Sequence, residues 1–234
     1  MGTTAGTARE VSVTGAPLRR RLTLPAGYVI SRGVGRGLLL APAAALPGMT
    51  ADELWDPATP AASRTFGGVI AASATEIAWT PRCSPLCRVR VLDVPTGRVT
   101  VVRMPGGNSV ANGAFSPDGR YLALQVSFGP GGSAGPDGPG GVGPGGGGGG
   151  GGSGALAMQL EVASVANGHL TIVPGTWVSS DALVGFGWPA EMDSLVAELS
   201  FPAKVQIASW HPGAARLAVA VIVLGRSSAS LIVG

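Results

Sequence analysis

The chain has 234 residues, of which 45% are hydrophobic and 12% are charged, so it can bury the core of one large or two small domains. The formal net charge is +3, but apart from 19–21 the arginines are scattered, which argues against nucleic-acid binding. The longest apolar run, 217–224, is too short for a membrane-spanning helix, and residues 1–13 lack the apolar core of a secretory signal. The chain as written is therefore expected to be soluble, without a transmembrane segment.

The first predicted elements are short strands within 11–24, followed by a strand, a tight turn and a second strand over 28–40. A further apolar strand ends at Asp56 and turns four residues later at Pro60. Asp can cap such a turn by accepting hydrogen bonds from backbone amides two residues on. This region therefore predicts antiparallel hairpins.

The next region repeats the pattern, with a strand–turn–strand unit at 69–79 and an apolar strand that ends at Asp93 and turns at Gly97. Between them lie Cys83 and Cys87, the only two cysteines of the chain. A local disulfide and two free thiols both fit this spacing, and a disulfide would favour an extracytoplasmic location. A four-ligand zinc site would need two more donors, so no metal site is predicted.

Residues 113–123 contain the sharpest strand–turn–strand pattern, with the turn at 116–119. Ser116 and Asp118 could suggest a nucleophile and its partner, but the turn itself calls for these residue types. The two histidines, His169 and His211, occupy turns elsewhere, so no catalytic residue is predicted. The following segment, 129–154, has seventeen glycines in twenty-six positions and is expected to be a disordered insertion.

Two more apolar strands end at Ser164 and Ser209, and each turns four residues later at a glycine. The four turn anchors Asp56, Asp93, Ser164 and Ser209 are 37, 71 and 45 residues apart, and the middle interval becomes 45 without the insertion. Spacings of about 40 to 45 residues are typical of a four-stranded propeller blade.

The stretch from Phe115 to Ala123 resembles the signature turn of the WD40-like repeats of TolB-type propellers, and Asp93 to Gly97 resembles the hairpin that commonly follows it. This resemblance implies an all-β fold, a β-propeller with about four recognisable four-stranded blades. The expected blades are 27–67, 68–104, 108–174 and 176–224. Residues 1–26 would be a remnant of a preceding blade or a disordered arm, and 225–234 a tail.

Four blades are fewer than a propeller ring usually has, so the ring is expected to be incomplete. An N-terminally truncated protein is the favoured explanation, and it would shift the expected location toward the outside of the cytoplasm. A four-bladed ring closed by the N-terminal strand and assembly between chains are the alternatives.

The antiparallel order of strands a to d within a blade sorts the connections onto two faces. The tight turns 116–119 and 93–97 fall on one face, here named the turn face. The cysteine loop, the glycine-rich insertion and the connections 105–112 and 175–181 fall on the opposite face, the loop face. Because variable loops on a rigid scaffold often carry binding residues, the loop face is the predicted binding surface. Its candidate residues are Asn108, Asn112, Ser179, Ser180 and Asp181.

The predicted function is that of a non-catalytic scaffold that binds a protein, peptide or glycan and needs no cofactor. The scarcity of histidine and the lack of a clustered acid–base set argue against an enzyme. The alternative is the propeller part of a hydrolase or lyase, with catalytic residues at the channel mouth or in a missing upstream region.

Overall fold

The computed structural model describes residues 7–11, 17–44, 51–59, 63–81, 88–104, 108–128, 157–179, 182–224 and 229–233. All regular structure in these ranges is β-strand. No helix in them is long and apolar enough to cross a membrane. The predicted disulfide of Cys83 and Cys87 and the predicted disordered insertion lie outside the described residues.

The first two large sheets each consist of four strands in chain order, and all of their pairs are antiparallel. The first sheet contains β3 (Tyr28–Val34), β4 (Gly37–Pro42), β5 (Ala51–Trp55) and β6 (Arg64–Gly67). The second contains β7 (Val69–Ala72), β8 (Glu76–Trp79), β9 (Arg88–Asp93) and β10 (Val99–Arg103). Before them, β1 (Thr7–Val11) and β2 (Pro17–Thr23) pair with each other as a separate hairpin.

The third and fourth sheets repeat this order and each gains one short strand. The third contains β11 (Asn108–Phe115), β12 (Tyr121–Phe128), β13 (Ala157–Ser164) and β14 (Leu170–Ile172), with β15 (Val178–Ser179) paired to β13. The fourth contains β16 (Leu183–Gly187), β17 (Leu195–Phe201), β18 (Lys204–Trp210), β19 (Ala218–Leu224) and β20 (Ala229–Val233). Residues 229–233, expected as part of a tail, thus extend the fourth sheet.

The hydrophobic core lies between the sheets. On β12, Leu122 and Leu124 pack with Val89 of the second sheet, whereas Ala123 packs with Leu195 of the fourth. Successive side chains of a strand point to opposite faces, so a strand buried on both faces needs an unbroken apolar run rather than strict alternation. The imperfect alternation of the β12 sequence follows from this double burial.

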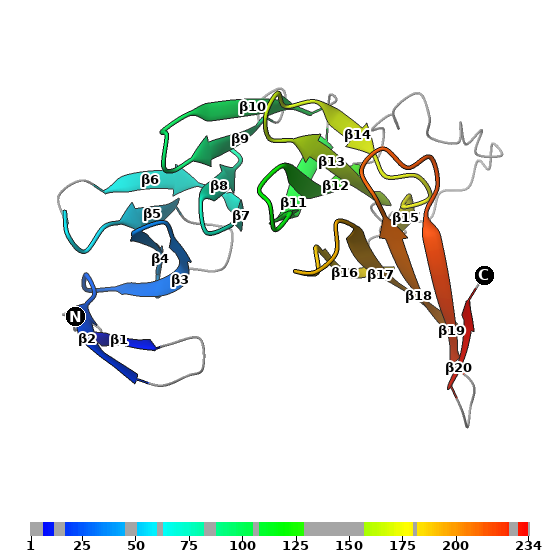
Figure 1. The fold of residues 1–234 in the computed structure, drawn as a ribbon, viewed down its shortest axis with the longest axis horizontal. Coiled ribbons are helices and arrows are strands. Elements are labelled where there is room, and N and C mark those ends of the chain that lie inside the picture. The colour runs from blue at the N-terminus through cyan, green and yellow to red at the C-terminus, as the bar shows by residue number, and fades with distance from the viewer. Residues whose placement is uncertain are drawn as a thin grey trace, which may run out of the picture.

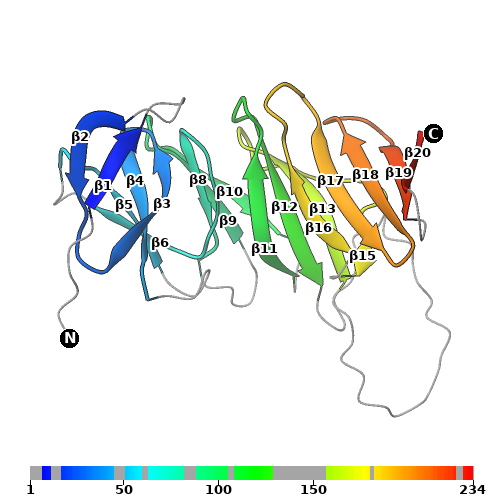
Figure 2. The ribbon, with the colours of Figure 1, turned by 90° about the horizontal axis from the view of Figure 1, so that it is seen from below.

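The four sheets follow one another along an arc, with β3, β7, β11 and β16 on its concave side (Figure 1). Seen from below, the sheets stand side by side in chain order (Figure 2). Consecutive four-stranded antiparallel sheets packed face to face are the blades of a β-propeller, which confirms the predicted fold class. The arc leaves the first and fourth sheets apart, so the ring is open (Figure 1).

The tight turns form as their sequences predict. Gly119 and Gly97 have φ angles of 69° and 70°, which residues other than glycine rarely adopt. The backbone amide of Gly97 donates to the carbonyl oxygen of Asp93 at 2.8 Å, and that of Gly168 donates to Ser164 at the same distance. The second and third blades therefore use one type of hairpin turn.

The connection expected at 105–112 is shorter than predicted. Asn108 and Asn112 lie within β11, where they pair with Phe128 and Gln125 of β12, and the register shifts between Val110 and Asn112. Asn and Gly are depleted in strands, which is why the sequence indicated a loop here. Pairing with β12 outweighs that local preference, and the bulge accommodates the irregular residues.

Candidate functional site

The turn 116–120 between β11 and β12 is held by its own side chains. The Ser116 hydroxyl donates to Asp118 Oδ1 at 2.6 Å and accepts from the Tyr121 backbone amide at 2.9 Å. The hydrogen bond from Ser116, the largest cause, holds the pKa of Asp118 below its usual value. Both residues are thus committed to the turn, as their sequence context indicates, and the Ser116 hydroxyl is not poised as a nucleophile.

The fourth blade reaches this turn through Trp188, which directly follows β16. Its indole Nε1 donates to the carbonyl oxygen of Ala114 at 3.1 Å. The indole also stacks on Tyr121, with ring centroids 6.1 Å apart and planes inclined by 16°. Strand-end packing therefore accounts for Trp188, and the same packing places its ring at the junction of the third and fourth blades.

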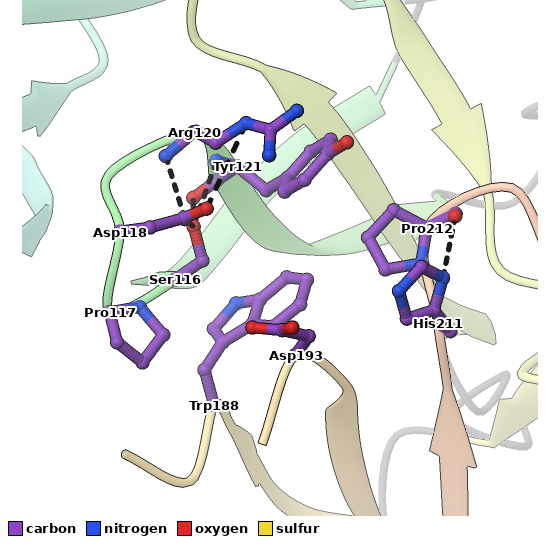
Figure 3. Close-up of a pocket in the computed structure, with 9 residues that line it drawn as sticks. All are labelled: Ser116, Pro117, Asp118, Arg120, Tyr121, Trp188, Asp193, His211 and Pro212. Carbon is purple, nitrogen blue, oxygen red and sulfur yellow. Dashed lines mark hydrogen bonds and ion pairs between the residues drawn. The ribbon is translucent and has the colours of Figure 1, made fainter. Parts of the chain in front are cut away.

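A pocket of about 300 Å³ opens at this junction (Figure 3). We name it the junction pocket. Three chain segments line it: the turn after β11, the connection between β16 and β17, and the residues after β18. Its lining residues are Ser116, Pro117, Asp118, Arg120, Tyr121, Trp188, Asp193, His211 and Pro212.

The junction pocket contains both charge signs. Arg120 Nε lies 3.8 Å from Asp118 Oδ2, and the Arg120 guanidinium carbon lies 5.7 Å from the Tyr121 ring centroid. His211 Nδ1 lies 2.9 Å from the carbonyl oxygen of Pro212, to which it donates when it carries the ring proton. Among the residues that the structure describes, no ion pair involves Asp193.

A second pocket, of about 280 Å³, adjoins the first because both are lined by Tyr121 and Pro212. We name it the hairpin pocket, since it lies against the β13–β14 hairpin. Its other lining residues are Val162, Ser164, Asn167, His169, Thr171, Trp210 and Gly213. We name these two adjoining pockets on the turn face the groove, and each contains one of the two histidines.

The sequence-predicted binding residues Asn108 and Ser179 lie on the opposite face. Asn108, Phe128, Ala157 and Ser179 follow one another in a row across β11, β12, β13 and β15, so Asn108 and Ser179 share one end of the third sheet. Asn112 lies further along β11, where its Oδ1 accepts from the Gly113 amide at 2.9 Å. Ser180 and Asp181 lie outside the described residues, and a binding role for this face stays a prediction.

Asn108 is buried, with 2% of its surface exposed, whereas the predicted binding residues Asn112 and Ser179 are exposed. Neither Nδ2 nor Oδ1 of its side chain has a hydrogen-bond partner among the described residues. Buried amides in folded proteins are nearly always paired, so this one is an exception among the described residues.

Sequence reasoning missed the groove and its residues Tyr121, Trp188, Asp193 and His211. A signal was available, because the strand order that places the turn 116–119 on the turn face also places the turn after β18 there. In the sequence, the two histidines belong to other hairpins than Ser116 and Asp118, so nothing local indicates that either lies near these residues. Packing of the fourth blade on the third brings His211 into the pocket that Ser116 and Asp118 line. In the described ranges, no group of three His, Cys, Asp or Glu side chains could hold a metal ion.

No protein-family model and no curated protein matches the sequence. Solved structures with a similar fold include hydrazine synthase from Kuenenia stuttgartiensis, at 13% identity and a TM-score of 0.50 over 85% of this chain and 57% of the other. TolB from Acinetobacter baumannii matches at 14% identity and a TM-score of 0.42, over 97% of this chain and 48% of the other. Oligogalacturonate lyase in complex with manganese matches at 12% identity and a TM-score of 0.41, over 99% of this chain and 72% of the other.

These likenesses bear on the fold, and identities of 12–14% carry no activity across to this chain. The chain spans 57% of the length of the hydrazine synthase chain. The prediction that the chain is not an enzyme is nevertheless wrong as an exclusion, because a structure with an enzyme's name, hydrazine synthase, shares this fold. That prediction rested on the scarcity of histidine and the lack of a clustered acid–base set in the sequence. Catalysis, however, needs only a few side chains that folding brings together.

Proposed function

We propose that the chain is a WD40-like β-propeller that acts as a binding scaffold, and that its ligand is an extended segment of polypeptide held in the turn-face groove. The observation that carries the proposal is the pair of adjoining pockets at the junction of the third and fourth blades. Both are formed by short turns anchored on paired strands, so the groove is presented by a rigid frame.

The two pockets suit a polypeptide because side chains two positions apart in an extended segment project to the same side, about 7 Å apart. One side chain could occupy the junction pocket while the next on that side occupies the hairpin pocket, with Tyr121 and Pro212 between them. The Tyr121 and Trp188 rings stack on each other, so at most one face of each ring is left for a ligand. Two adjoining pockets that can take alternate side chains of one extended segment favour a peptide over a glycan.

The test is a selection of random dodecapeptides displayed on phage against the purified chain. Enriched clones are then measured against the double variant Asp193→Ala/His211→Ala, in which both substituted side chains are exposed and the fold is expected to persist. The proposal expects binding to weaken at least about tenfold, since central contacts of an interface dominate its affinity. Glu191→Gln, an exposed charge change close in sequence to Asp193, should leave binding unchanged.

Two results would overturn this proposal. One is a selection in which no enriched clone distinguishes the double variant from the parent chain. The other is binding that survives in the double variant and is lost in Ser179→Ala, an exposed position at the loop-face end of the third sheet, which would move the site to the loop face. The unpartnered Asn108 amide is the observation that keeps that face as the second candidate location.

A further inference from the structure

The charged side chains that line the junction pocket are mostly negative, whereas the chain as a whole is positively charged. The whole chain carries a formal net charge of +3, yet the charged side chains that line this pocket are two aspartates, one arginine and a histidine. A ligand that reaches the pocket would therefore meet two carboxylates and one guanidinium, a surplus of negative charge when the histidine is neutral.

The two aspartates are not equivalent. Asp118 receives hydrogen bonds from Ser116 Oγ and from the Arg120 backbone amide, the latter at 3.0 Å, and its second oxygen faces the Arg120 guanidinium. The Arg120 side chain is 72% exposed and lies over the Tyr121 ring, so it neutralises Asp118 at the rim of the pocket. The charges of Asp118 and Arg120 are thus paired with each other in the absence of a ligand.

Asp193 is the carboxylate left for a ligand. It lies in the connection between β16 and β17, it is exposed, and no ion pair within the described part of the chain engages it. Asp193, Trp188 and His211 all line the pocket (Figure 3). A pocket lined by a free carboxylate and an indole favours an organic cation, because the carboxylate pairs with the charge while the ring quadrupole attracts it.

An arginine or lysine side chain fits this setting better than a small inorganic cation. Its alkyl part can lie along Trp188 and Pro212, and its charged end can reach Asp193 from the open side of the pocket. Arginine fits the pocket better than lysine, because its planar guanidinium can pair with a carboxylate through two hydrogen bonds and stack on an aromatic ring.

We propose that the groove recognises polypeptides through a basic side chain, arginine above lysine, seated in the junction pocket between the Asp193 carboxylate and the Trp188 ring. This inference rests on the proposed function, because it names the ligand chemistry of the same groove. It assigns Asp193 as the specificity-determining residue.

The experiment uses the dodecapeptides enriched on the parent chain, synthesised with a fluorescent label and titrated against purified protein. A double-mutant cycle combines Asp193→Asn in the protein with replacement of the basic residue by glutamine in the peptide. The expected result is roughly a tenfold loss of affinity for either change alone and little further loss for both together, since both remove the same charge pair. Glu191→Gln removes an equal charge in the same connection without lining the pocket and should have no effect.

The possible outcomes separate the two proposals. Enriched peptides that need the groove but share no basic residue, or a cycle in which the two losses simply multiply, would overturn the basic-side-chain inference and leave the binding proposal standing. Peptides whose binding ignores the Asp193→Ala/His211→Ala variant would overturn both. A shared arginine coupled to Asp193 supports both.

Discussion

The turn 116–120 has two sides, and they differ in how a neighbouring blade meets them. Toward the second blade, the Glu76 side chain lies against Gly119 and accepts hydrogen bonds from the Ser73 and Thr75 hydroxyls. At the same junction, Gly168 of the third blade lies against the Val101 carbonyl of the second. Toward the fourth blade, Trp188 and Tyr121 meet as stacked rings beside an open pocket. Close packing of glycine and backbone fills one junction, while two large rings bridge the other and leave space beside them.

This difference separates stability from recognition within one repeat architecture. Substitutions at the filled second–third junction should mainly change the free energy of unfolding. Substitutions at the open third–fourth junction should mainly change ligand binding.

The largest effect is expected for Gly168→Ala at the filled junction. Gly168 has a φ of 72°, and an added Cβ would collide with the carbonyl oxygen of Val101. Gly97 is the matched control, because its φ is 70° and no atom lies within 4 Å of an added Cβ. We expect a loss of about 3–4 kcal/mol for Gly168→Ala and about 1–2 kcal/mol for Gly97→Ala in urea unfolding. Equal losses would mean that the junction yields readily and is not closely packed.

The next effect concerns Glu161, a carboxyl group within the same junction. Glu161 pairs in register with Leu124, which packs against the second blade, and it is 2% exposed. Its Oε2 has no hydrogen-bond partner among the described residues, and burial raises its pKa to about 7 from the ordinary 4.5. The folded chain therefore holds a proton that the unfolded chain releases between these pH values, so stability falls as pH rises through this window and stays low above it.

Glu161→Met should remove that pH dependence. Each pKa unit corresponds to about 1.4 kcal/mol, so the variant should be more stable than the parent by about 3 kcal/mol at pH 8 and by little at pH 4. Thermal unfolding of both proteins across this range measures the difference. Glu198→Gln, which changes an exposed carboxyl, is the control. A parent chain whose stability does not fall between pH 5 and 8 would show that Glu161 is solvated or paired in solution.

The filled junction was also the part that the sequence predicted well. The anchors Asp93 and Ser164, with their glycines four residues on, predicted the turn type, and the strand–turn–strand pattern of 113–123 predicted the β11–β12 hairpin. These features are local, because turn chemistry and strand pattern depend on residues close together in the chain. Glu161 was not noticed, since burial of a single acid within an apolar strand depends on how the next blade packs.

The groove could not be predicted in the same way. Its lining comes from residues as far apart as Ser116 and His211, and each of them has a local explanation as a turn or packing residue. The loop face was predicted instead from the presence of long connections. Asn108 and Asn112 were placed in a loop because their residue types favour one, although pairing with β12 makes them part of a strand.

A moderate effect is expected at the open junction for Trp188→Phe. The substitution removes the indole N–H that bonds to the Ala114 carbonyl, which should cost about 1–2 kcal/mol of unfolding free energy. Trp177→Phe is the matched control, because Trp177 packs against Phe128 and no indole hydrogen bond is found for it within the described residues. Peptide affinity should fall more in Trp188→Phe than in the control. If both variants lose equal stability and equal affinity, Trp188 contributes only ring area.

The smallest effect on stability is expected for Arg120→Ala. Arg120 is 72% exposed, its partner Asp118 is 47% exposed, and surface ion pairs contribute less than about 1 kcal/mol, so the change should stay within roughly 0.5 kcal/mol. Affinity for an arginine-bearing dodecapeptide should instead rise severalfold at low salt, because a like charge leaves the rim and Asp118 loses its partner. Titrations at two salt concentrations measure this, since screening weakens such an effect. A loss of affinity would show that Arg120 itself holds the ligand, which would make the pocket a site for an acidic group and reverse the assignment of Asp193.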